Sequence, residues 1–388
     1  MLRMSSQGAG TFDTGESDMR KSRASACAAV VLGLVAVGGT VPAAADVRAP
    51  VDLGTLPDGV YSATTAINNR GAVAGISRTT DGVFHPVRWS RNGTIKQLSL
   101  PDGVDFGQTV DINESNTVLG YYQDQQLDLH PAVWAAGGLR TDLPLPPGVT
   151  YSLVNDINNA GTVVGYASPN PVRWNTDGTV TVLPLLPGGT GGQAVAINDT
   201  GTIVGFSRVP DGTRHAVRWS PDGTITDLGT LGGGDSDSVD VNERGAVAGQ
   251  AQGADGAYHA VRWTRNGRIT ELGQVDSRAV AINDGGVVVG TAEGAPVRWT
   301  GTTPTMLPLL AGDFQGFTVD VNRTGVVAGI SGDPFSGGRG VVWDAAGVPT
   351  ELGPVPGGQT TSVNDINDLG AVVGNMRTAN GDIHAVRW

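Results

Sequence analysis

Apolar and polar positions alternate along most of the chain in short runs separated by clusters of Gly, Asn, Asp and Pro. One stretch, residues 193–231, contains four such runs, at 194–198, 202–207, 215–219 and 224–228. Alternation with a period of two predicts half-buried strands, here called strands a, b, c and d in chain order. We therefore expect an all-β chain assembled from four-stranded units.

The same unit recurs along the chain, and two residue types mark it. An Asn closes strand a and a Trp closes strand c, 21 residues later in six copies and 16 residues later in two. Successive Asn residues lie 39 to 45 positions apart, a period typical of propellers and solenoids. We interpret both series as structural: Asn68, Asn113, Asn158, Asn198, Asn242, Asn283, Asn322 and Asn367, with Trp89, Trp134, Trp174, Trp219, Trp263, Trp299, Trp343 and Trp388.

The turn between strands a and b is the most regular part of the repeat. Each series Asn is followed three positions later by Gly in seven copies and by Asn116 in the eighth. Asn first and Gly fourth is the preference of a type I turn. Asn is the residue after Gly that best tolerates positive φ, so the exception also points to a backbone requirement.

Both ends of the repeat region are incomplete units. Residues 51–56 form a strand d with no a, b or c before it, and Trp388 ends a strand c with no d after it. Joining the two fragments makes one whole unit and removes the open sheet edges. We predict one β-propeller of eight four-stranded blades, closed by pairing of the N-terminal strand with the C-terminal blade. A seven-bladed ring ranks second because it leaves a unit over.

The first 45 residues have the composition of a secretion signal. Basic residues at 19–23 precede an apolar run at 24–41 and a possible A-x-A cleavage site at 43–45. Acidic residues within 1–18 do not suit a signal, so we take Met19 as the expected start. We expect residues 46–388 to be a single secreted domain, with an uncleaved membrane anchor as the alternative. Cys27, the only cysteine, lies in this leader, so the mature domain has no thiol.

The charge balance argues against nucleic acid as a partner. The whole chain carries −12, and residues 46–388 carry 21 basic against 34 acidic side chains, a net charge of −13. Phosphate binding requires clustered Lys and Arg, and Lys96 is the only lysine after the leader. No segment after the leader has the length and hydropathy of a membrane span. We expect a monomer whose partner is a glycan or a protein.

The repeat resembles the HAF repeat family of probable extracellular proteins. The likeness rests on the series A-[IV]-[AD]-I-N-x-x-G-x-V-V-G, on H-A-x-x-W, and on D-L-G-T-L-G-G at 227–233, and it covers nearly all of residues 51–388. The Phe of the His-Ala-Phe triplet is replaced by Val217, Val261 and Val386. The resemblance implies secretion and a repeat scaffold, and it brings no catalytic residues.

The titratable residues of the repeat do not form a catalytic motif. H-E-x-x-H, G-x-S-x-G and P-loop motifs are missing from the sequence. Every histidine stands four residues before a Trp, which indicates a packing position rather than a catalytic one: His85, His130, His215, His259 and His384. We expect no cofactor. Asp235, Asp237 and Asp240 are the only candidates for a calcium site, and turn formation by these residues is the competing and favoured interpretation.

Two residues before the series Asn, five copies carry Asp and three carry Ala. Pairing of this Asp with the strand-c Arg of its own unit does not fit, because Asp111 and Asp320 occur in units whose Arg is replaced by Val. Pairing across blades and a solvated channel lining both stay open.

The b–c and d–a connections vary in length and emerge on one side of the disc, which we call the loop face. Variable loops on a constant scaffold are where binding concentrates. Our candidate ligand-binding residues are those that break the repeat there: Phe106, Tyr121, Tyr122, Asp124, Phe314 and Phe317. Exposed aromatics beside Asp suit sugar rings, although core packing explains some of them equally well. Units 3 and 6 have shorter b–c loops and would form low points on this face.

These observations favour a secreted, non-enzymatic repeat protein that acts as a binding scaffold for a glycan, a cell-envelope component or a protein. The alternative is a secreted hydrolase or lyase with its site on the loop face. An enzyme requires clustered carboxylates outside the repeat pattern, or a metal, in one cleft.

Overall fold

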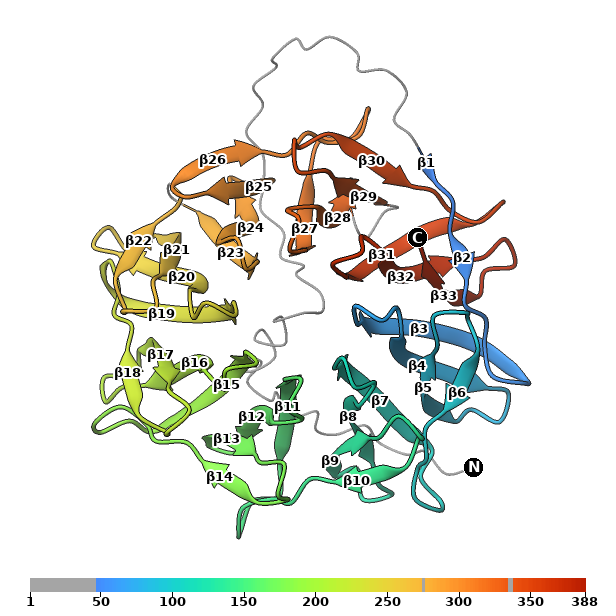
Figure 1. Ribbon diagram of the computed structural model, residues 1–388, viewed down its shortest axis with the longest axis horizontal. Helices are drawn as coiled ribbons and strands as arrows, with labels where there is room; N and C mark the ends of the chain where they lie inside the picture. Colours follow the sequence, from blue (N-terminus) through green and yellow to red (C-terminus); the bar gives the residue numbers. More distant parts are fainter. Residues whose placement is uncertain (1–46, 274–275, 334–337) are drawn as a thin grey trace, which may run out of the picture.

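The structure, a computed structural model, describes residues 47–273, 276–333 and 338–388, and the side chains of 359–361 are left out of the description. The predicted leader at 1–45 lies outside the described residues. All regular elements among the described residues are strands, as the alternating pattern predicts. They form four-stranded antiparallel units in a propeller-like arrangement, in which successive units follow one another around a common centre (Figure 1).

We call the units blades and number them in chain order. Blades 1 and 2 comprise β3 (Gly59–Ile67), β4 (Val73–Thr79), β5 (Phe84–Trp89) and β6 (Ile95–Gln97), then β7 (Phe106–Ile112), β8 (Val118–Gln123), β9 (Leu129–Trp134) and β10 (Arg140–Asp142). Blades 3 and 4 comprise β11 (Ser152–Ile157), β12 (Val163–Ala167), β13 (Asn170–Trp174) and β14 (Val180–Val182), then β15 (Gly191–Ile197), β16 (Ile203–Arg208), β17 (Arg214–Trp219) and β18 (Ile225–Asp227).

Blades 5 and 6 comprise β19 (Gly232–Val241), β20 (Val247–Gly253), β21 (Tyr258–Trp263) and β22 (Ile269–Glu271), then β23 (Ser277–Ile282), β24 (Val287–Ala292), β25 (Ala295–Thr300) and β26 (Thr303–Met306). Blades 7 and 8 comprise β27 (Gly316–Val321), β28 (Val327–Ser331), β29 (Arg339–Trp343) and β30 (Pro349–Leu352), then β31 (Gln359–Ile366), β32 (Val372–Arg377), β33 (Ile383–Arg387) and β2 (Val51–Asp52).

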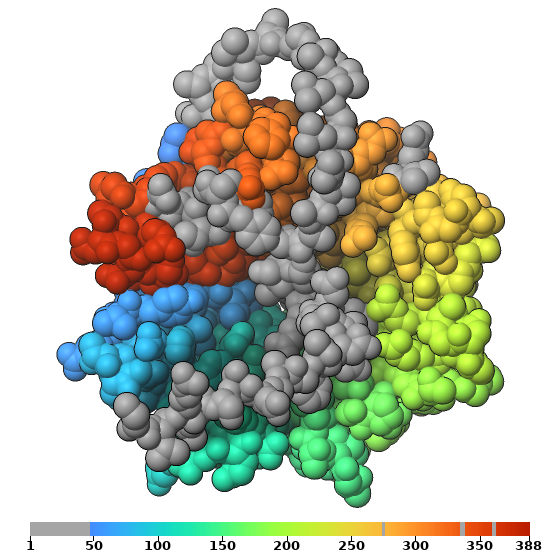
Figure 2. Space-filling view, turned by 180° about the vertical axis from the view of Figure 1, so that it is seen from behind, coloured from blue at the N-terminus to red at the C-terminus, as the bar shows by residue number. Residues whose placement is uncertain are grey.

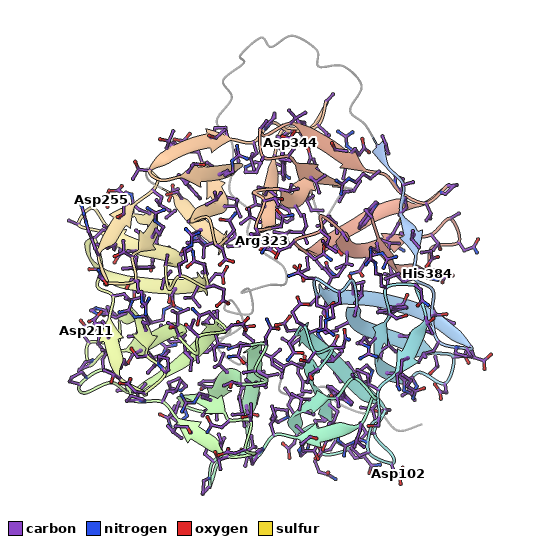
Figure 3. The ribbon with its side chains drawn as sticks, viewed as in Figure 1. Asp102, Asp211, Asp255, Arg323, Asp344 and His384 are labelled. Carbon is purple, nitrogen blue, oxygen red and sulfur yellow. The ribbon has the colours of Figure 1, made fainter. Side chains whose placement is uncertain are left out.

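Seen from behind, the blades follow one another in the same chain order but in the opposite sense around the disc, with the first and last blades again side by side (Figure 2). The first strand of each blade is the innermost. Arg323, which follows the end of β27, lies near the centre, whereas Asp211 and Asp255 in b–c loops lie at the periphery (Figure 3). Because neighbouring strands within a blade are antiparallel, the a–b and c–d turns lie on one face, called the turn face, and the b–c and d–a connections lie on the opposite one, the loop face.

The N-terminal segment pairs with the last two blades. β1 (Val47–Arg48) adds to β30 in parallel, and β2 adds to β33 in antiparallel register with Val51 opposite Arg387. This is the pairing predicted from the incomplete units, but it is shorter than the expected strand at 51–56. Gly54 has φ +70 and donates its N–H to Asp52 Oδ1, which turns the chain out of strand geometry.

The tryptophans fill the spaces between blades. Seven of them are at most 1% exposed, and Trp134 packs against Ala66 and Ala74 of the preceding blade. Six indole N–H groups donate to carbonyls at the outer end of the preceding blade, for example Trp219 to Pro184 at 2.8 Å. The indole nitrogens of Trp89 and Trp299 are buried without a hydrogen-bond partner.

The series Asn residues do more than close their own turns. Their Oδ1 atoms accept turn N–H groups as expected, and the residue three positions later has positive φ in every copy, including Asn116 at +61°. Each Nδ2 also donates to the carbonyl of the next series Asn at 2.9–3.2 Å. The last of these bonds runs from Asn367 back to Asn68. This inter-blade role is not visible in a single repeat.

The Asp two residues before the series Asn binds backbone amides at a β-bulge. In blade 8, Asp365 Oδ1 accepts the N–H of Ile366 and Oδ2 accepts the N–H of Ile67 in blade 1, both at 2.8 Å. Asp156 and Asp240 bind their own and the following blade in the same way. The blades that follow these three are blades 4, 6 and 1, and they carry Ala at the same position: Ala196, Ala281 and Ala66. Of the alternatives left open, contact across blades is observed for Asp156, Asp240 and Asp365, and it includes the backbone of the following blade.

Candidate functional site

The side chains of the turn face are largely committed to holding blades together. Besides the Asn series, strand-c arginines donate to carbonyls of the following blade, as Arg88 does to Asn116 and Arg298 to Asp344. The residue after each series Asn accepts the matching N–H of the preceding blade in seven places, for example Glu114 from Asn69. The side chains available for recognition must therefore be sought on the loop face.

Four aromatic rings form a continuous row at the junction of blades 1 and 2. The ring centroids are 6.2 Å apart for Tyr61 and Phe84, 5.7 Å for Phe84 and Phe106, and 6.5 Å for Phe106 and Tyr121. All four side chains are half-buried. We call them the aromatic row. Two of its members, Phe106 and Tyr121, are among the candidates chosen from the sequence, and the other two were missed.

The backbone explains why these rings meet. Phe84 begins β5 and Phe106 begins β7, and the two residues pair directly in parallel. The Phe84 N–H donates to the carbonyl of Asp105 at 2.8 Å, which joins the two blades at the loop face. Strand a of one blade thus starts beside strand c of the preceding blade.

Polar groups frame the aromatic row. The guanidinium of Arg78 lies 5.4 Å from the Phe84 ring centroid, a cation–π distance. The hydroxyl of Tyr121 donates to Gln108 Oε1 at 3.0 Å, and burial raises the pKa of Tyr61. Apolar ring surface flanked by hydrogen-bonding groups can accommodate the apolar face of a sugar or the side chain of a partner protein.

Two sequence candidates have other roles. Tyr122 is 7% exposed and belongs to the core between blades 1 and 2, where it stacks on His130 at 4.9 Å with Arg140 at 4.9 Å from its ring. Asp124 accepts His130 Nε2 at 2.7 Å and the N–H groups of its own loop. Tyr122 is therefore a packing residue rather than the exposed candidate we expected, and Asp124 shapes the b–c loop.

The remaining pair lies in blade 7, apart from the aromatic row. Phe314 is 86% exposed in the connection that leads into β27. Phe317, within β27, is half-buried against the core shared with blade 8. The two residues therefore differ in exposure, and of this pair only Phe314 presents most of its ring to solvent.

Three of the five histidines repeat one contact, with a carboxylate of strand d. His215 binds Asp227 at 2.9 Å, His384 binds Asp52 at 2.8 Å and His259 binds Glu271 at 2.9 Å. In each case the partner sits in the neighbouring strand d. These contacts support the structural interpretation of this position.

The proposed calcium ligands are held by protein groups. Asp235 accepts the Arg214 N–H and the Tyr258 hydroxyl, Asp237 pairs with Arg214 Nη2 at 3.2 Å, and Asp240 binds the bulge amides. Among the described residues, no group of three or more His, Cys, Asp or Glu side chains is placed to hold a metal ion.

Asp237 is nevertheless unlike the carboxylates of the repeat. It is 8% exposed, and its Oδ1 is buried without a hydrogen-bond partner. Burial raises the pKa of Asp237, although Arg214 opposes this shift. Since the folded-state pKa is raised, the carboxyl contributes stability below its ordinary pKa of about 4 and loses it as the pH rises through the folded value.

Asp237→Asn is therefore expected to be more costly at pH 4 than at pH 7. Asn keeps the shape of the neutral carboxyl but cannot ionise, so the variant escapes the penalty of a buried charge at neutral pH. Thermal melts of both proteins between pH 4 and pH 8 measure the difference. A difference in Tm that stays constant over this range would show that the charge of Asp237 is not disfavoured by folding.

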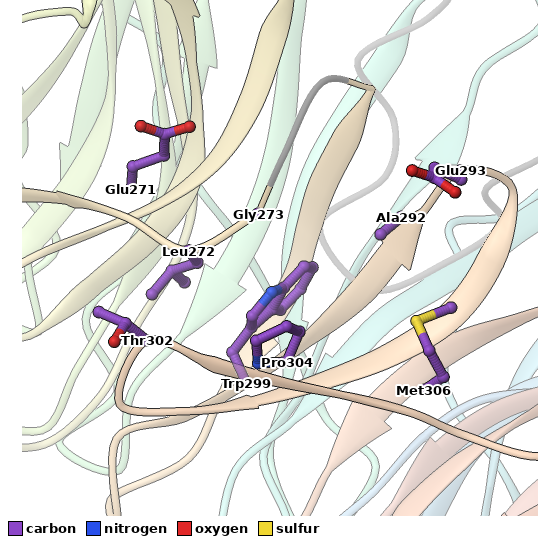
Figure 4. A pocket seen from close by; sticks show the side chains of 9 residues that line it. All are labelled: Glu271, Leu272, Gly273, Ala292, Glu293, Trp299, Thr302, Pro304 and Met306. Carbon is purple, nitrogen blue, oxygen red and sulfur yellow. The ribbon is translucent and has the colours of Figure 1, made fainter.

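A hollow of about 410 Å³ lies on the flank of the molecule between blades 5 and 6 (Figure 4). Glu271, Leu272 and Gly273 line it from blade 5, and blade 6 contributes Ala292, Glu293, Trp299, Thr302, Pro304 and Met306. The sequence predicted a low point at blade 6 from its short b–c loop. None of the lining residues was among the binding candidates chosen from the sequence, and Trp299 was assigned only to the structural Trp series.

Comparisons with known proteins bear on the fold. No family model and no curated protein matches the chain. A streptogramin B lyase structure aligns over 87% of this chain and 96% of its own at 11% identity and a TM-score of 0.46. Virginiamycin B lyase from Staphylococcus aureus aligns over 87% and 97% at 13% identity, with a TM-score of 0.44.

A prolyl endopeptidase structure aligns over 82% of this chain and 55% of its own chain, at 12% identity and a TM-score of 0.54. This likeness supports the propeller-like, all-β architecture and does not extend to activity. Within the described residues, no helix has the length and hydropathy needed to cross a bilayer.

Proposed function

We propose that the protein is a secreted, monomeric, non-enzymatic member of the HAF-repeat type that binds a glycan, a cell-envelope component or a protein through its loop face. Its scaffold in this proposal is a ring of eight blades, closed where β2 completes blade 8. The pairing of β2 with β33 and the bond from Asn367 to Asn68 support closure. A closed ring holds the loop face rigid, which lowers the conformational cost of binding.

The aromatic row is the observation that carries this proposal. The same strand positions hold smaller or polar residues in most other blades, so the scaffold itself does not require four adjoining rings there. Half-buried rings are held in fixed orientation by their neighbours and still offer an edge or a face to a ligand. A glycan is the ligand class that best fits rings flanked by Arg and Gln side chains.

Replacing Phe84 or Tyr61 by alanine is expected to weaken binding of the ligand about three- to tenfold, since a stacking contact contributes about 0.5–1.5 kcal/mol beyond burial. The ligand is first found with the secreted protein on a glycan array and by pull-down from envelope extracts. Affinities are then measured by calorimetry, with the melting temperature as a check on folding.

The matched control is Tyr166→Ala. Tyr166 lies in β12 at the position that Tyr121 has in β8, and its ring meets Tyr151 at 6.3 Å on blade 3. The proposal requires the control to bind like the parent. Equal losses in Tyr166→Ala and Phe84→Ala would place the site elsewhere, and a failure to retain any ligand would argue against a binding scaffold.

A hydrolase or lyase is the second candidate function, and the surroundings of Asp237 favour it. Asp237 combines a raised pKa with Asp235, Arg214 and Tyr258 nearby, a grouping outside the repeat pattern. Perturbed carboxyls of this kind occur at active sites as well as in structural networks. An enzyme would lose turnover in Asp237→Asn while keeping ligand affinity, whereas a scaffold has no turnover to lose.

A further inference from the structure

The turn face carries two groups of arginines that the repeat does not require. The second residue after the series Asn is Arg in blades 1 and 5 alone, and the second residue after the series Trp is Arg in the same two blades. These residues are Arg70 with Arg91 and Arg244 with Arg265. Other blades hold Ala, Thr or Gly at both positions, so neither turn depends on a basic side chain.

The preceding blade adds a further arginine to each group. Nη1 of Arg218, at the end of strand c in blade 4, donates to the carbonyl of Arg265, and Nη1 of Arg387 in blade 8 donates to the carbonyl of Arg91 at 2.8 Å. The members of these pairs are 47 and 296 positions apart in the chain. The fold therefore gathers basic residues that are scattered in the sequence.

At the junction of blades 4 and 5 the arginines border a hollow of about 140 Å³, which we call the turn-face hollow. Its lining residues are Arg218, Arg265, Thr202, Ser220, Pro221 and Gly245. The stem of Arg265 lies against Gly245, since a Cβ atom at that glycine would be 3.3 Å from Cγ of Arg265. Arg265 is exposed and Arg218 is half-buried, so solvent reaches both side chains.

The positive charge of the turn-face hollow is not neutralised by the protein. None of the lining residues is acidic, and neither arginine forms an ion pair with a carboxylate in the described part of the chain. Burial and the charge of Arg265 both lower the pKa of Arg218, so the two guanidinium groups lie close enough to repel. An anion between them would relieve this repulsion.

The donors and the size of the hollow indicate which anion fits. Guanidinium groups match phosphate, sulfate and carboxylate oxygens, and the hydroxyls of Thr202 and Ser220 add donors on other sides. Donors on several sides suit a tetrahedral oxyanion better than a planar carboxylate. A volume of about 140 Å³ is below the roughly 300 Å³ at which sites for larger ligands begin, so only a small group enters. At the junction of blades 8 and 1, Ala371 replaces Thr202 and a donor is lost.

We propose that the turn-face hollow between blades 4 and 5 binds a tetrahedral oxyanion, a phosphate or sulfate group that is free or is carried as an ester on a larger molecule. Arg218 and Arg265 bind its oxygens from two blades, and the hydroxyls complete the contact. This site lies on the face opposite the aromatic row, so it stands or fails independently of the function proposed for the loop face.

The test measures binding of inorganic sulfate to the purified protein by calorimetry at constant ionic strength. Sulfate is expected to bind at least about fivefold more tightly than acetate, because acetate offers oxygens in one plane only. Galactose 6-sulfate, compared with galactose, distinguishes the two sources of the anion. An affinity equal to or above that of inorganic sulfate assigns the site to an ester, and loss of binding assigns it to the free anion.

Variants locate the binding. Arg265→Gln should weaken sulfate binding about fivefold or more at an unchanged melting temperature, because its exposed side chain is replaced while its carbonyl still accepts from Arg218. Arg268→Gln is the matched control, since Arg268 is exposed in the same c–d turn and carries the same charge but does not line the hollow. Undetectable sulfate binding at millimolar concentration, equal affinity for acetate, or equal losses in the two variants would each overturn the proposal.

Discussion

Asp365→Ala is expected to lower the free energy of unfolding by about 2–5 kcal/mol, because it leaves two buried amides without their acceptor. Asp365 binds the N–H of Ile366 in its own blade and that of Ile67 in blade 1, each at 2.8 Å. Both isoleucines are at most 6% exposed, so water cannot readily replace the carboxylate. The lost hydrogen bond to Ile67 lies at the junction of blades 8 and 1, where the first and last parts of the repeat region meet.

The bulge in strand a is the reason these amides need a side chain. In blade 8 the register shifts between Val363 and Asp365, which takes the neighbouring N–H out of the ladder. Ala66 in blade 1 has no oxygen to offer, so the amide of Ile67 depends on the preceding blade. The same dependence links Ala196 to Asp156 and Ala281 to Asp240.

Asp111→Ala is the matched control. Asp111 accepts the N–H of Ile112, and the next blade carries its own Asp156, whose Oδ1 accepts the N–H of Ile157. The control orphans the amide of Ile112 and leaves that of Ile157 paired with Asp156, so it removes the acceptor of one of these bulge amides where Asp365→Ala removes that of two, and we expect a smaller loss. Urea unfolding followed by tryptophan fluorescence measures both variants. Equal losses at Asp365 and Asp111 would refute the cross-blade role of the carboxylate.

The sequence predicted the strands and the a–b turn because each depends on residues within one repeat. The cross-blade bonds of Asn68 or Asp365 depend on how far apart two blades lie. That distance follows from the curvature of the whole propeller-like arrangement and cannot be obtained from one unit. The pattern of Asp and Ala was visible in the sequence, but its cause required the structure.

Tyr121 and Tyr122 show how the candidate site was only partly predictable. Neighbouring residues of a strand point to opposite faces, so the pair could not both face the same side. Tyr122 follows the strand-b Gly by two residues, and this position holds Ser77, Ser207 or Ala251 in other blades, all fully buried. That comparison within the sequence could have assigned Tyr122 to the core. Phe84 escaped notice because its partner Phe106 lies 22 residues away, across a blade junction.

Removing residues 47–56 is expected to have the largest effect on the thermal stability and the oligomeric state of the protein. The truncation deletes β1 and β2, leaving the outer edges of blades 7 and 8 without their last strand. It also removes Leu53 and Leu56, which are at most 7% exposed and pack with Trp89 at the junction of blades 8 and 1. Burial of two leucines alone contributes about 3–6 kcal/mol, and an uncovered strand edge is a site for pairing with another chain.

We therefore expect the truncated protein to melt well below the parent and to form dimers or larger species, as measured by calorimetry and sedimentation velocity. Removal of residues 47–49 is the control. It deletes β1 but keeps β2, the Asp52–His384 contact and both leucines, so it should remain monomeric with a small loss of stability. The distinction matters because β1 adds a fifth strand to blade 7, which already has four, whereas β2 is the fourth strand of blade 8. If the longer truncation also stays monomeric and melts like the parent, the N-terminal strand is an accessory of the propeller-like fold, and the Asn and Asp bonds at the inner turns hold the ends of the chain together without it.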